Sequence, residues 1–420
     1  MSLANHILRK MPSTLQVTSL VAFAVALPAG PAFAASYSVI HNFTGTSMGD
    51  GDTPIPELVL DQSGRLYGTT EFGGQFDLGT IFRLTKPAKG SKVWTEDILR
   101  SFNSNEANRP EGGVLIGASG ELYGTTQTGG TFGGGSVYRI DNGTLTTLHE
   151  FDPHNNDGYF PIAGLTFGAN GLLYGTTSGG ANPNDGTVFS ISPQGGGVEY
   201  ALLHNFGNGI DGAHPIYGRV VANGKGVLTG TTEDGGANSA GTIFQLTPPS
   251  KKNPNWTEAV RYSFDPSGGN DASHPLNGLV AGAGGVFYGC GSAGRRGQGA
   301  VYALTPLGGN NWSETIIYNF GDQAGDPVVD RCALTVNAAG SLFGTTNGGG
   351  QFGAGAFFEV DPPAGGQTSW TEKVLHSFGP FSSADGVQPE SAPVRQGTHY
   401  YGVTTGGGTS GLGTVYEITP

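Results

Sequence analysis

The sequence predicts an all-β fold, a seven-bladed β-propeller of four-stranded antiparallel blades, and three observations support this prediction. A Leu-Tyr-Gly-Thr-Thr motif at residues 66–70 recurs at intervals of 51 to 59 residues. Four short β-like runs accompany each copy, and the two ends of the chain are fragments of one such unit. Four-stranded units of roughly this size, in four to eight copies, are typical of propellers. The motif glycines are Gly68, Gly124, Gly175, Gly230, Gly289, Gly344 and Gly402.

The first unit shows the four expected strands: A at 57–60, B at 66–70, C at 80–84 and D at 94–102. These runs are rich in β-branched and aromatic residues and are bounded by Gly, Pro, Asn and Asp, which is the pattern of short strands. In every copy a glycine precedes strand C, an aromatic residue follows it three positions later, and strand D ends on phenylalanine. A large ring required in each copy is expected to pack between adjacent units.

The ends of the chain predict how the ring closes. A D-type strand at 37–43 has no A, B or C strand before it, and a C-type strand at 414–418 has no D strand after it. Together they complete one blade, so we expect the N-terminal strand to pair in the last blade. Closure of this kind removes the exposed edges of an open array.

The repeat reads L-Y-G-T-T-x-x-G-G, then G-T-V-F-x-L-T-P, then W-T-E-x-x-L-x-S-F. It resembles the Gloeo/Verruco (GloVer) tandem repeat of secreted bacterial proteins, and the resemblance covers nearly all of the chain after residue 34. It implies a propeller-like repeat architecture, but it implies no particular activity.

Residues 1–34 have the pattern of a signal peptide. Arg9 and Lys10 form a basic start, an apolar stretch surrounds 20–27, and Ala32-Phe33-Ala34 is a typical cleavage site. We therefore expect a secreted or periplasmic protein with a single domain at 35–420 and no membrane span after leader removal. A retained N-terminal anchor is the alternative.

Composition limits the partners. The formal net charge is −13, and removal of a leader with two basic and no acidic residues gives −13 − 2 = −15. This balance argues against a nucleic-acid partner, because phosphate contacts need basic surface. No metal-ligand spacing such as H-E-x-x-H occurs, so no metal or cofactor is expected. We expect a monomer.

The two cysteines, Cys290 and Cys332, fall near the same face of neighbouring blades. An exported compartment would permit a disulfide between them. Two buried thiols are the alternative, since free cysteine behaves as a small apolar residue.

Aspartates recur in the D-to-A loops, which share one face of the ring with the B-to-C loops: Asp50, Asp157, Asp211, Asp271 and Asp385. One interpretation is turn chemistry, in which the side chain accepts hydrogen bonds from its own loop. The other is a ring of carboxylates at the channel mouth that binds a cation or sugar hydroxyls. The sequence leaves both open.

Two further groups are candidates for a site on this face. His214 and His274 precede the D-to-A prolines of blades 4 and 5, where they would lie together at the mouth, whereas the histidines two residues before the strand D phenylalanines suit packing positions. Arg295 and Arg296 in the blade 5 loop could bind an acidic ligand such as a uronate.

These observations predict a binding or interaction scaffold whose ligand is a glycan or a protein. The alternative is a polysaccharide lyase or hydrolase that uses His214, His274, Asp211 and Asp271 as acid and base groups. The arrangement of the polar side chains distinguishes the two functions. An enzyme needs unlike groups within hydrogen-bond reach in one pocket, whereas a scaffold needs only a broad, repeated rim.

Overall fold

The computed structural model describes residues 35–420 except 105–106, 181–184, 194–198, 208, 269–270, 310, 324 and 382. Residues 35–420 form one compact unit. The expected signal peptide at 1–34 lies outside the described residues and stays a prediction. Within the described part of the chain, no helix has the length and hydrophobicity that crossing a membrane would require.

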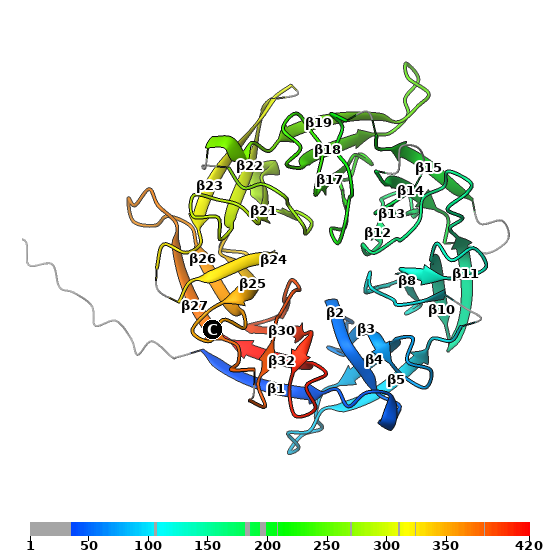
Figure 1. The fold of residues 1–420 in the computed structure, drawn as a ribbon, viewed down its shortest axis with the longest axis vertical. Helices are drawn as coiled ribbons and strands as arrows, with labels where there is room; N and C mark the ends of the chain where they lie inside the picture. The colour runs from blue at the N-terminus through cyan, green and yellow to red at the C-terminus, as the bar shows by residue number, and fades with distance from the viewer. Residues whose placement is uncertain are drawn as a thin grey trace, which may run out of the picture. The chain divides into compact units, whose positions relative to one another are not determined.

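Seven four-stranded antiparallel sheets are arranged as blades around a ring, which confirms the predicted fold class (Figure 1). Blades 1 to 4 contain β2 (Gly51–Leu60), β3 (Leu66–Gly73), β4 (Thr80–Thr85) and β5 (Thr95–Ser101); β7 (Val114–Ile116), β8 (Leu122–Thr126), β10 (Ser136–Asp141) and β11 (Thr144–Glu150); β12 (Thr166–Phe167), β13 (Leu173–Thr177), β14 (Thr187–Ile191) and β15 (Tyr200–Asn205); β16 (Val221–Ala222), β17 (Leu228–Thr232), β18 (Thr242–Thr247) and β19 (Thr257–Ser263).

Blades 5 to 7 follow the same order from strand A to strand D. They contain β20 (Val280–Ala281), β21 (Phe287–Gly291), β22 (Ala300–Gly308) and β23 (Asn311–Asn319); β24 (Pro327–Val336), β25 (Leu342–Gly349), β26 (Ala356–Asp361) and β27 (Thr371–Ser377); β29 (Val394–Gln396), β30 (His399–Thr404), β32 (Thr414–Thr419) and β1 (Ser36–Asn42). Two short pairs and three 3-10 turns complete the described elements: β6 (Ala107–Asn108) with β9 (Thr128–Gly129), β28 (Gly386–Val387) with β31 (Gly406–Gly407), η1 (Thr46–Met48), η2 (Pro266–Gly268) and η3 (Ala283–Gly285).

The ring closes through the N-terminal strand, as predicted. Strand β1 pairs antiparallel with β32, in a register that runs from Ser36 opposite Thr419 to Asn42 opposite Thr414. Figure 1 shows blue β1 at the outer edge of the red blade formed by the C-terminal strands. Strand D of blade 7 therefore comes from the start of the domain.

Adjacent blades meet through a repeated pair of aromatic rings. The phenylalanine that ends strand D packs on the strand C aromatic of the next blade at all seven junctions, with centroids 5.1 to 5.4 Å apart. These phenylalanines are at most 1% exposed. The prediction that they pack between units is confirmed, and each such pair adds about 0.5–1.5 kcal/mol beyond its burial.

The motif glycine makes room for the strand C aromatic ring. A Cβ at Gly230 would lie 2.5 Å from Cζ of Phe244, and the same collision would occur at Gly68, Gly175 and Gly344. Where the aromatic is a tyrosine, as at Tyr138, its hydroxyl occupies the equivalent space. The glycine is therefore required by packing.

The two threonines of the motif have separate roles. The second shares a hydroxyl hydrogen bond with the first residue of strand C, as between Thr177 and Thr187 at 2.7 Å. The first reaches the next blade at three junctions, where the hydroxyls of Thr125, Thr231 and Thr345 donate to the carbonyls of Ala163, Asn277 and Ser391. The second threonine thus fixes the hairpin, and the first ties neighbouring blades at these three junctions.

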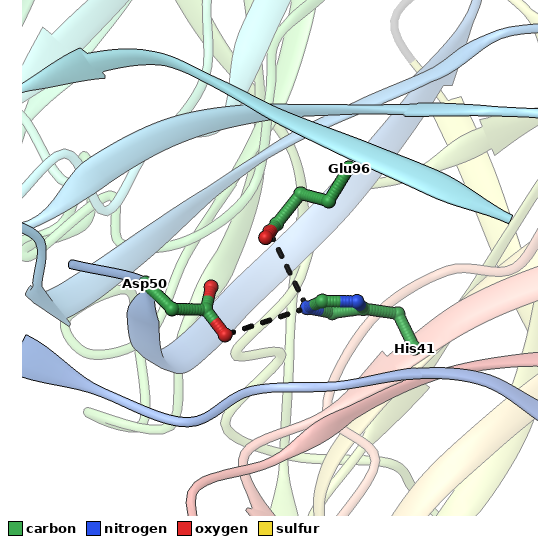
Figure 2. A group of neighbouring side chains, drawn as sticks. All are labelled: His41, Asp50 and Glu96. Atoms are coloured by element: carbon green, nitrogen blue, oxygen red, sulfur yellow. Dashed lines mark ion pairs between the residues drawn. The ribbon is translucent and has the colours of Figure 1, made fainter. Parts of the chain in front are cut away.

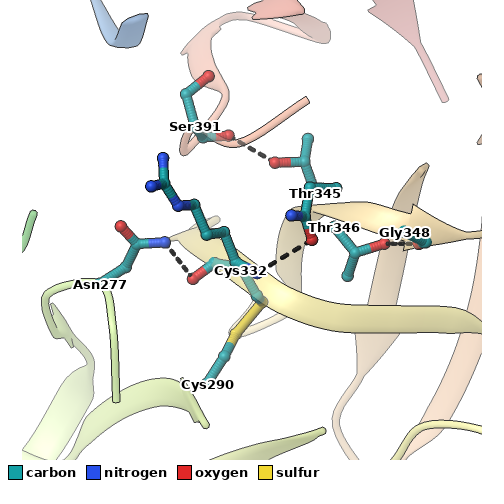
Figure 3. The surroundings of a disulfide bond; sticks show 9 residues. Asn277, Cys290, Cys332, Thr345, Thr346, Gly348 and Ser391 are labelled. Carbon is teal, nitrogen blue, oxygen red and sulfur yellow. Dashed lines mark hydrogen bonds between the residues drawn. A yellow bond between two sulfur atoms is a disulfide. The ribbon is translucent and has the colours of Figure 1, made fainter. Parts of the chain in front are cut away.

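Cys290 occupies the position of the first threonine in blade 5, and it is joined to Cys332 of blade 6 in a disulfide. Figure 3 shows the bridge beside the Asn277 amide, which donates to the carbonyl of Cys332 at 2.8 Å. In the next blade Thr345 makes the ordinary contact, donating to the Ser391 carbonyl at 2.7 Å. A covalent link thus stands where other junctions use a hydrogen bond.

We predict that Gly230→Ala lowers the free energy of unfolding by about 1–3 kcal/mol, because the added methyl must push the Phe244 ring off its partner. Denaturant titration of the purified domain measures the change. Gly224→Ala is the matched control in the same blade, since its added Cβ would meet no atom within 4 Å. Equal stability of the two variants would contradict the packing role.

We also predict that replacing both cysteines by serine costs about 2–4 kcal/mol of stability, as is typical when a native disulfide is lost. The variant Cys290→Thr/Cys332→Ala should recover part of this cost, because threonine can restore the hydrogen bond that other junctions use. Thermal unfolding of both variants under oxidising conditions tests this. No difference between them would show that the threonine contact contributes nothing here.

Candidate functional site

The D-to-A loop aspartates are directed to the outer strands of the blades. Asp211 is 2% exposed, and its carboxylate lies 3.2 Å from His204 Nε2 and accepts from the Gly207 amide at 3.2 Å. Equivalent carboxylates bind the strand D side chain and their own loop backbone in other blades: Asp50, Asp157, Asp271 and Asp385. The turn interpretation accounts for these contacts, and none of the five lines the cavity at the mouth described below.

At six junctions among the described residues, a third side chain from strand D of the next blade joins this pair. Figure 2 shows the case of His41, whose Nε2 lies 3.3 Å from Glu96 and 3.7 Å from Asp50. The third residue is a glutamate at four junctions and a tyrosine at two: Glu96, Glu258, Glu314, Glu372, Tyr200 and Tyr37.

His41, Asp50 and Glu96 offer atoms close enough to hold a metal ion. At the equivalent junction of blades 6 and 7, however, Tyr37 takes the place of the glutamate and donates its hydroxyl to Asp385. Because the same arrangement is completed by a tyrosine elsewhere, we interpret it as a clamp between blades.

The residue before the D-to-A proline has a positive φ in six blades: Thr53, Arg109, Phe160, His214, His274 and Gln388. Values lie between 49° and 57°, a region that side chains rarely adopt. Its amide reaches back to the preceding blade, as His214 does to the Asp185 carbonyl at 2.7 Å. This backbone is uniform while its side chains differ, and strained positions of this kind gather at functional sites.

Strand A carries one extra residue in blade 4. Four positions separate the proline from the buried aliphatic residue in blade 5, from Pro275 to Leu279, but five separate Pro215 from Val220. In blade 6 the amide that reaches back to the preceding blade belongs to Val329, which donates to the Gln298 carbonyl at 2.9 Å, so the position after Val329 is the equivalent of the proline and four positions separate it from Leu334, as in blade 5. Blade 4 sends Arg219 into the channel, and Arg331 of blade 6 and Arg109 of blade 2 line the mouth.

A cavity of about 330 Å³ opens at the channel mouth, lined by residues of five blades. Arg331 lines this cavity, donates to the Tyr217 hydroxyl at 2.8 Å and stacks 4.2 Å from the centroid of that ring. Its guanidinium also pairs with Glu390. Burial lowers the pKa of Arg331, but Glu390 and Tyr217 outweigh this and raise it overall. Arg331 is therefore a fixed positive charge.

The other side of the cavity carries a second arginine among carboxylates. Arg109 pairs with Glu71 and lies 3.6 Å from Glu111, which is 5% exposed. Burial raises the pKa of Glu111, with the two arginines opposing. Among the described residues, Gln127 Oε1 and Arg109 Nε are buried yet have no hydrogen-bond partner. An unpaired acceptor and an unpaired donor thus line the same cavity.

A second cavity of about 310 Å³ lies deeper in the channel and shares Tyr217 and Glu390 with the first. Arg219 lines it, pairs with Glu57 and donates to the carbonyls of Leu165 at 2.5 Å and Val114 at 3.2 Å. The four residues come from four different blades. Arg219 thus crosslinks the channel below the mouth.

His214 and His274 do lie together, and Asp234 holds them. Its carboxylate is 3.0 Å from Nδ1 of His214 and 3.4 Å from Nδ1 of His274. Asp211 and Asp271 are instead committed to His204 and Tyr262 in the outer layer. The four residues of the catalytic alternative are therefore not gathered in one pocket.

Arg295 and Arg296 lie apart from the mouth cavity. Both pair with Asp322, and both side chains are 57% exposed. A uronate site at this loop stays a prediction.

Sequence reasoning missed the residues that form the mouth: Glu71, Arg109, Glu111, Gln127, Tyr217, Arg331 and Glu390. The signal lay in positions that vary between copies. They are the residue before the proline, the residue after the proline, the residue after the two threonines, and the positions of Tyr217 and Arg331 at the entry to strand A.

Comparison with known proteins identifies the repeat. A family model described as the Gloeobacter/Verrucomicrobia repeat matches residues 31–244, 91–294 and 275–420. No curated protein matches the sequence.

Solved structures with a similar fold are distant in sequence. They include a luciferin-regenerating enzyme (11% identity, TM-score 0.41, 92% of this chain and 95% of that one), a putative 6-phosphogluconolactonase from Bacteroides uniformis (14%, 0.45, 91% and 91%) and the polysaccharide lyase Uly1 (11%, 0.42, 88% and 91%). At these identities the likeness concerns the fold alone.

The junction glutamates predict a pH dependence of stability. Burial, with a neighbouring aspartate in each case, raises the pKa of Glu258 and Glu372 to about 7 and that of Glu314 to about 8, from an ordinary value of 4.5. The folded state holds these protons more tightly, so their stabilisation is complete below about pH 4.5 and is lost as the pH rises through about 7 to 8.

We expect Glu258→Gln/Glu372→Gln to be more stable than the wild type at pH 9, on the order of 1 kcal/mol per site, and no more stable at pH 4. Unfolding midpoints measured across this range test the prediction. The matched control is Glu199→Gln, an exposed glutamate. Parallel pH profiles for wild type and double variant would contradict it.

Proposed function

Because the chain belongs to the Gloeobacter/Verrucomicrobia repeat family and folds as a propeller, we propose that it is an exported binding scaffold whose ligand enters the channel mouth. The observation that carries this proposal is the mouth cavity, where unlike polar groups from five blades converge. Its volume of about 330 Å³ falls within the usual range for ligand pockets. Gln127 and Arg109 belong to this lining, and each holds a buried polar atom that has no hydrogen-bond partner within the described part of the chain.

The charge of the mouth favours one class of ligand. Two arginines face three glutamates in the cavity lining, so 2 − 3 = −1. Glu233 and Asp234 beside it bring the total to −3 with the histidines neutral. A ligand that supplies hydrogen-bond donors, such as sugar hydroxyls or an ammonium group, fits this lining. A uronate would add a further negative charge.

An array of neutral, amino and uronate oligosaccharides tests this proposal with the purified domain. We expect binding to neutral or amino sugars and at least a tenfold loss, about 1.4 kcal/mol, for Gln127→Leu and for Glu111→Gln. Arg295→Ala/Arg296→Ala is the control, because these arginines lie outside the cavity. Binding that survives both mouth variants, or that only the control abolishes, would contradict the assignment.

A second candidate is a polysaccharide lyase or hydrolase. The pair of histidines held by Asp234 supports it, because imidazoles are the usual acid and base groups near neutral pH. Product release from the same oligosaccharides, lost in His214→Ala/His274→Ala, would establish turnover.

A further inference from the structure

The B-to-C loops of blades 1, 2 and 6 each expose a phenylalanine at the same position, Phe76, Phe132 and Phe352. Each loop begins with two residues of positive φ, such as Gly73 and Gly74, and the residue after the phenylalanine also has positive φ. This backbone turns the ring outward, and 43% to 50% of each of the three residues is exposed.

The fold does not require these rings. Blades 4, 5 and 7 place Asn238, Arg296 and Ser410 at the same position, and the next residue or the one after it again has positive φ. Since a polar residue serves the loop equally well, an exposed phenylalanine in three blades needs another explanation. Contiguous exposed apolar surface usually marks an interaction site.

Neighbouring loops extend the apolar surface. We define the phenylalanine rim as the following residues, each 37% to 76% exposed: Met48, Phe76, Phe132, Phe160, Phe352 and Phe381. The turn that carries Met48 is tied to the Phe76 loop through Thr46 Oγ1, which donates to Asp77 at 2.8 Å. The amide of Phe160 donates to the Gly134 carbonyl of the Phe132 loop at 2.9 Å.

The blade 1 loop that carries Phe76 also contacts the acidic mouth at its base. Arg109, which lines the cavity, lies 5.3 Å from the ring centroid of Phe72 at the base of the blade 1 loop. A partner that covers the rim therefore also meets the mouth, whose charge is negative. A second copy of this chain would bring two such mouths together, and its formal charge of −13 adds to the repulsion.

We propose that the loop face binds a protein segment that combines basic and apolar side chains. The apolar side chains pack on the phenylalanine rim, and a lysine or arginine enters the acidic mouth. This inference rests on the proposed function, in which a ligand enters the channel mouth, and it adds the chemical class of the binding partner. Attraction between the charges also predicts that binding weakens as salt increases.

Selection of a phage-displayed random peptide library against the immobilised domain tests the proposal. We expect enriched sequences that hold lysine or arginine beside aromatic or aliphatic residues. The corresponding synthetic peptides should bind at least tenfold more weakly to Phe76→Ser/Phe132→Ser/Phe352→Ser. The matched control is Val93→Ser/Leu307→Ser, two exposed apolar residues on the opposite face, of which Val93 lies in the C-to-D loop of blade 1 and Leu307 lies near the end of β22.

The outcomes separate the rim from the mouth. Peptides that depend on the rim but bind Glu390→Gln and Glu111→Gln normally would keep the rim as a docking surface and refute the basic group in the mouth. Enrichment of acidic peptides, no enrichment, or equal loss in the control variant would overturn the proposal. Glycan binding that the rim variant abolishes, without peptide enrichment, would identify a glycan as the occupant instead.

Discussion

Contact between the strand D phenylalanine and the next blade's strand C aromatic is the interaction on which the ring depends. It recurs at all seven junctions with nearly constant spacing, 5.1 to 5.4 Å between centroids. The other invariant residues serve it, because the motif glycine leaves space for the aromatic ring and the second threonine fixes the hairpin behind it. The residues shared by all copies of the repeat are therefore explained by packing between and within the blades.

The inner and outer strands of the blades have different roles. Strands B, C and D and the clamps between them are nearly uniform, whereas strand A and its entry loop differ from blade to blade. This variable part of blades 4 and 6 places Arg219 and Arg331 in the channel. A site can thus be built on the inner rim without disturbing the aromatic junctions.

Sequence reasoning recovered the fold because every blade repeats the same physical requirement. The direction of the loop aspartates could not be read in this way, since it depends on whether a strand D histidine or tyrosine lies beside them. His214 and His274 lie together as expected, but Asp234, which holds them, belongs to a different loop. Tyr217 and Arg331 lie 114 residues apart and meet only when the ring closes.

Closure by strand β1 has a consequence for how the protein is made. Ser36 pairs with Thr419, a separation of 419 − 36 = 383 residues, so strand β1 has no partner until β32 has been synthesised. Until then the growing chain is an open array with unpaired strand edges, which invite association with other chains. Pairing over such a distance is also intrinsically slow. The first strand must therefore be kept apart from foreign sheet edges until the last one emerges.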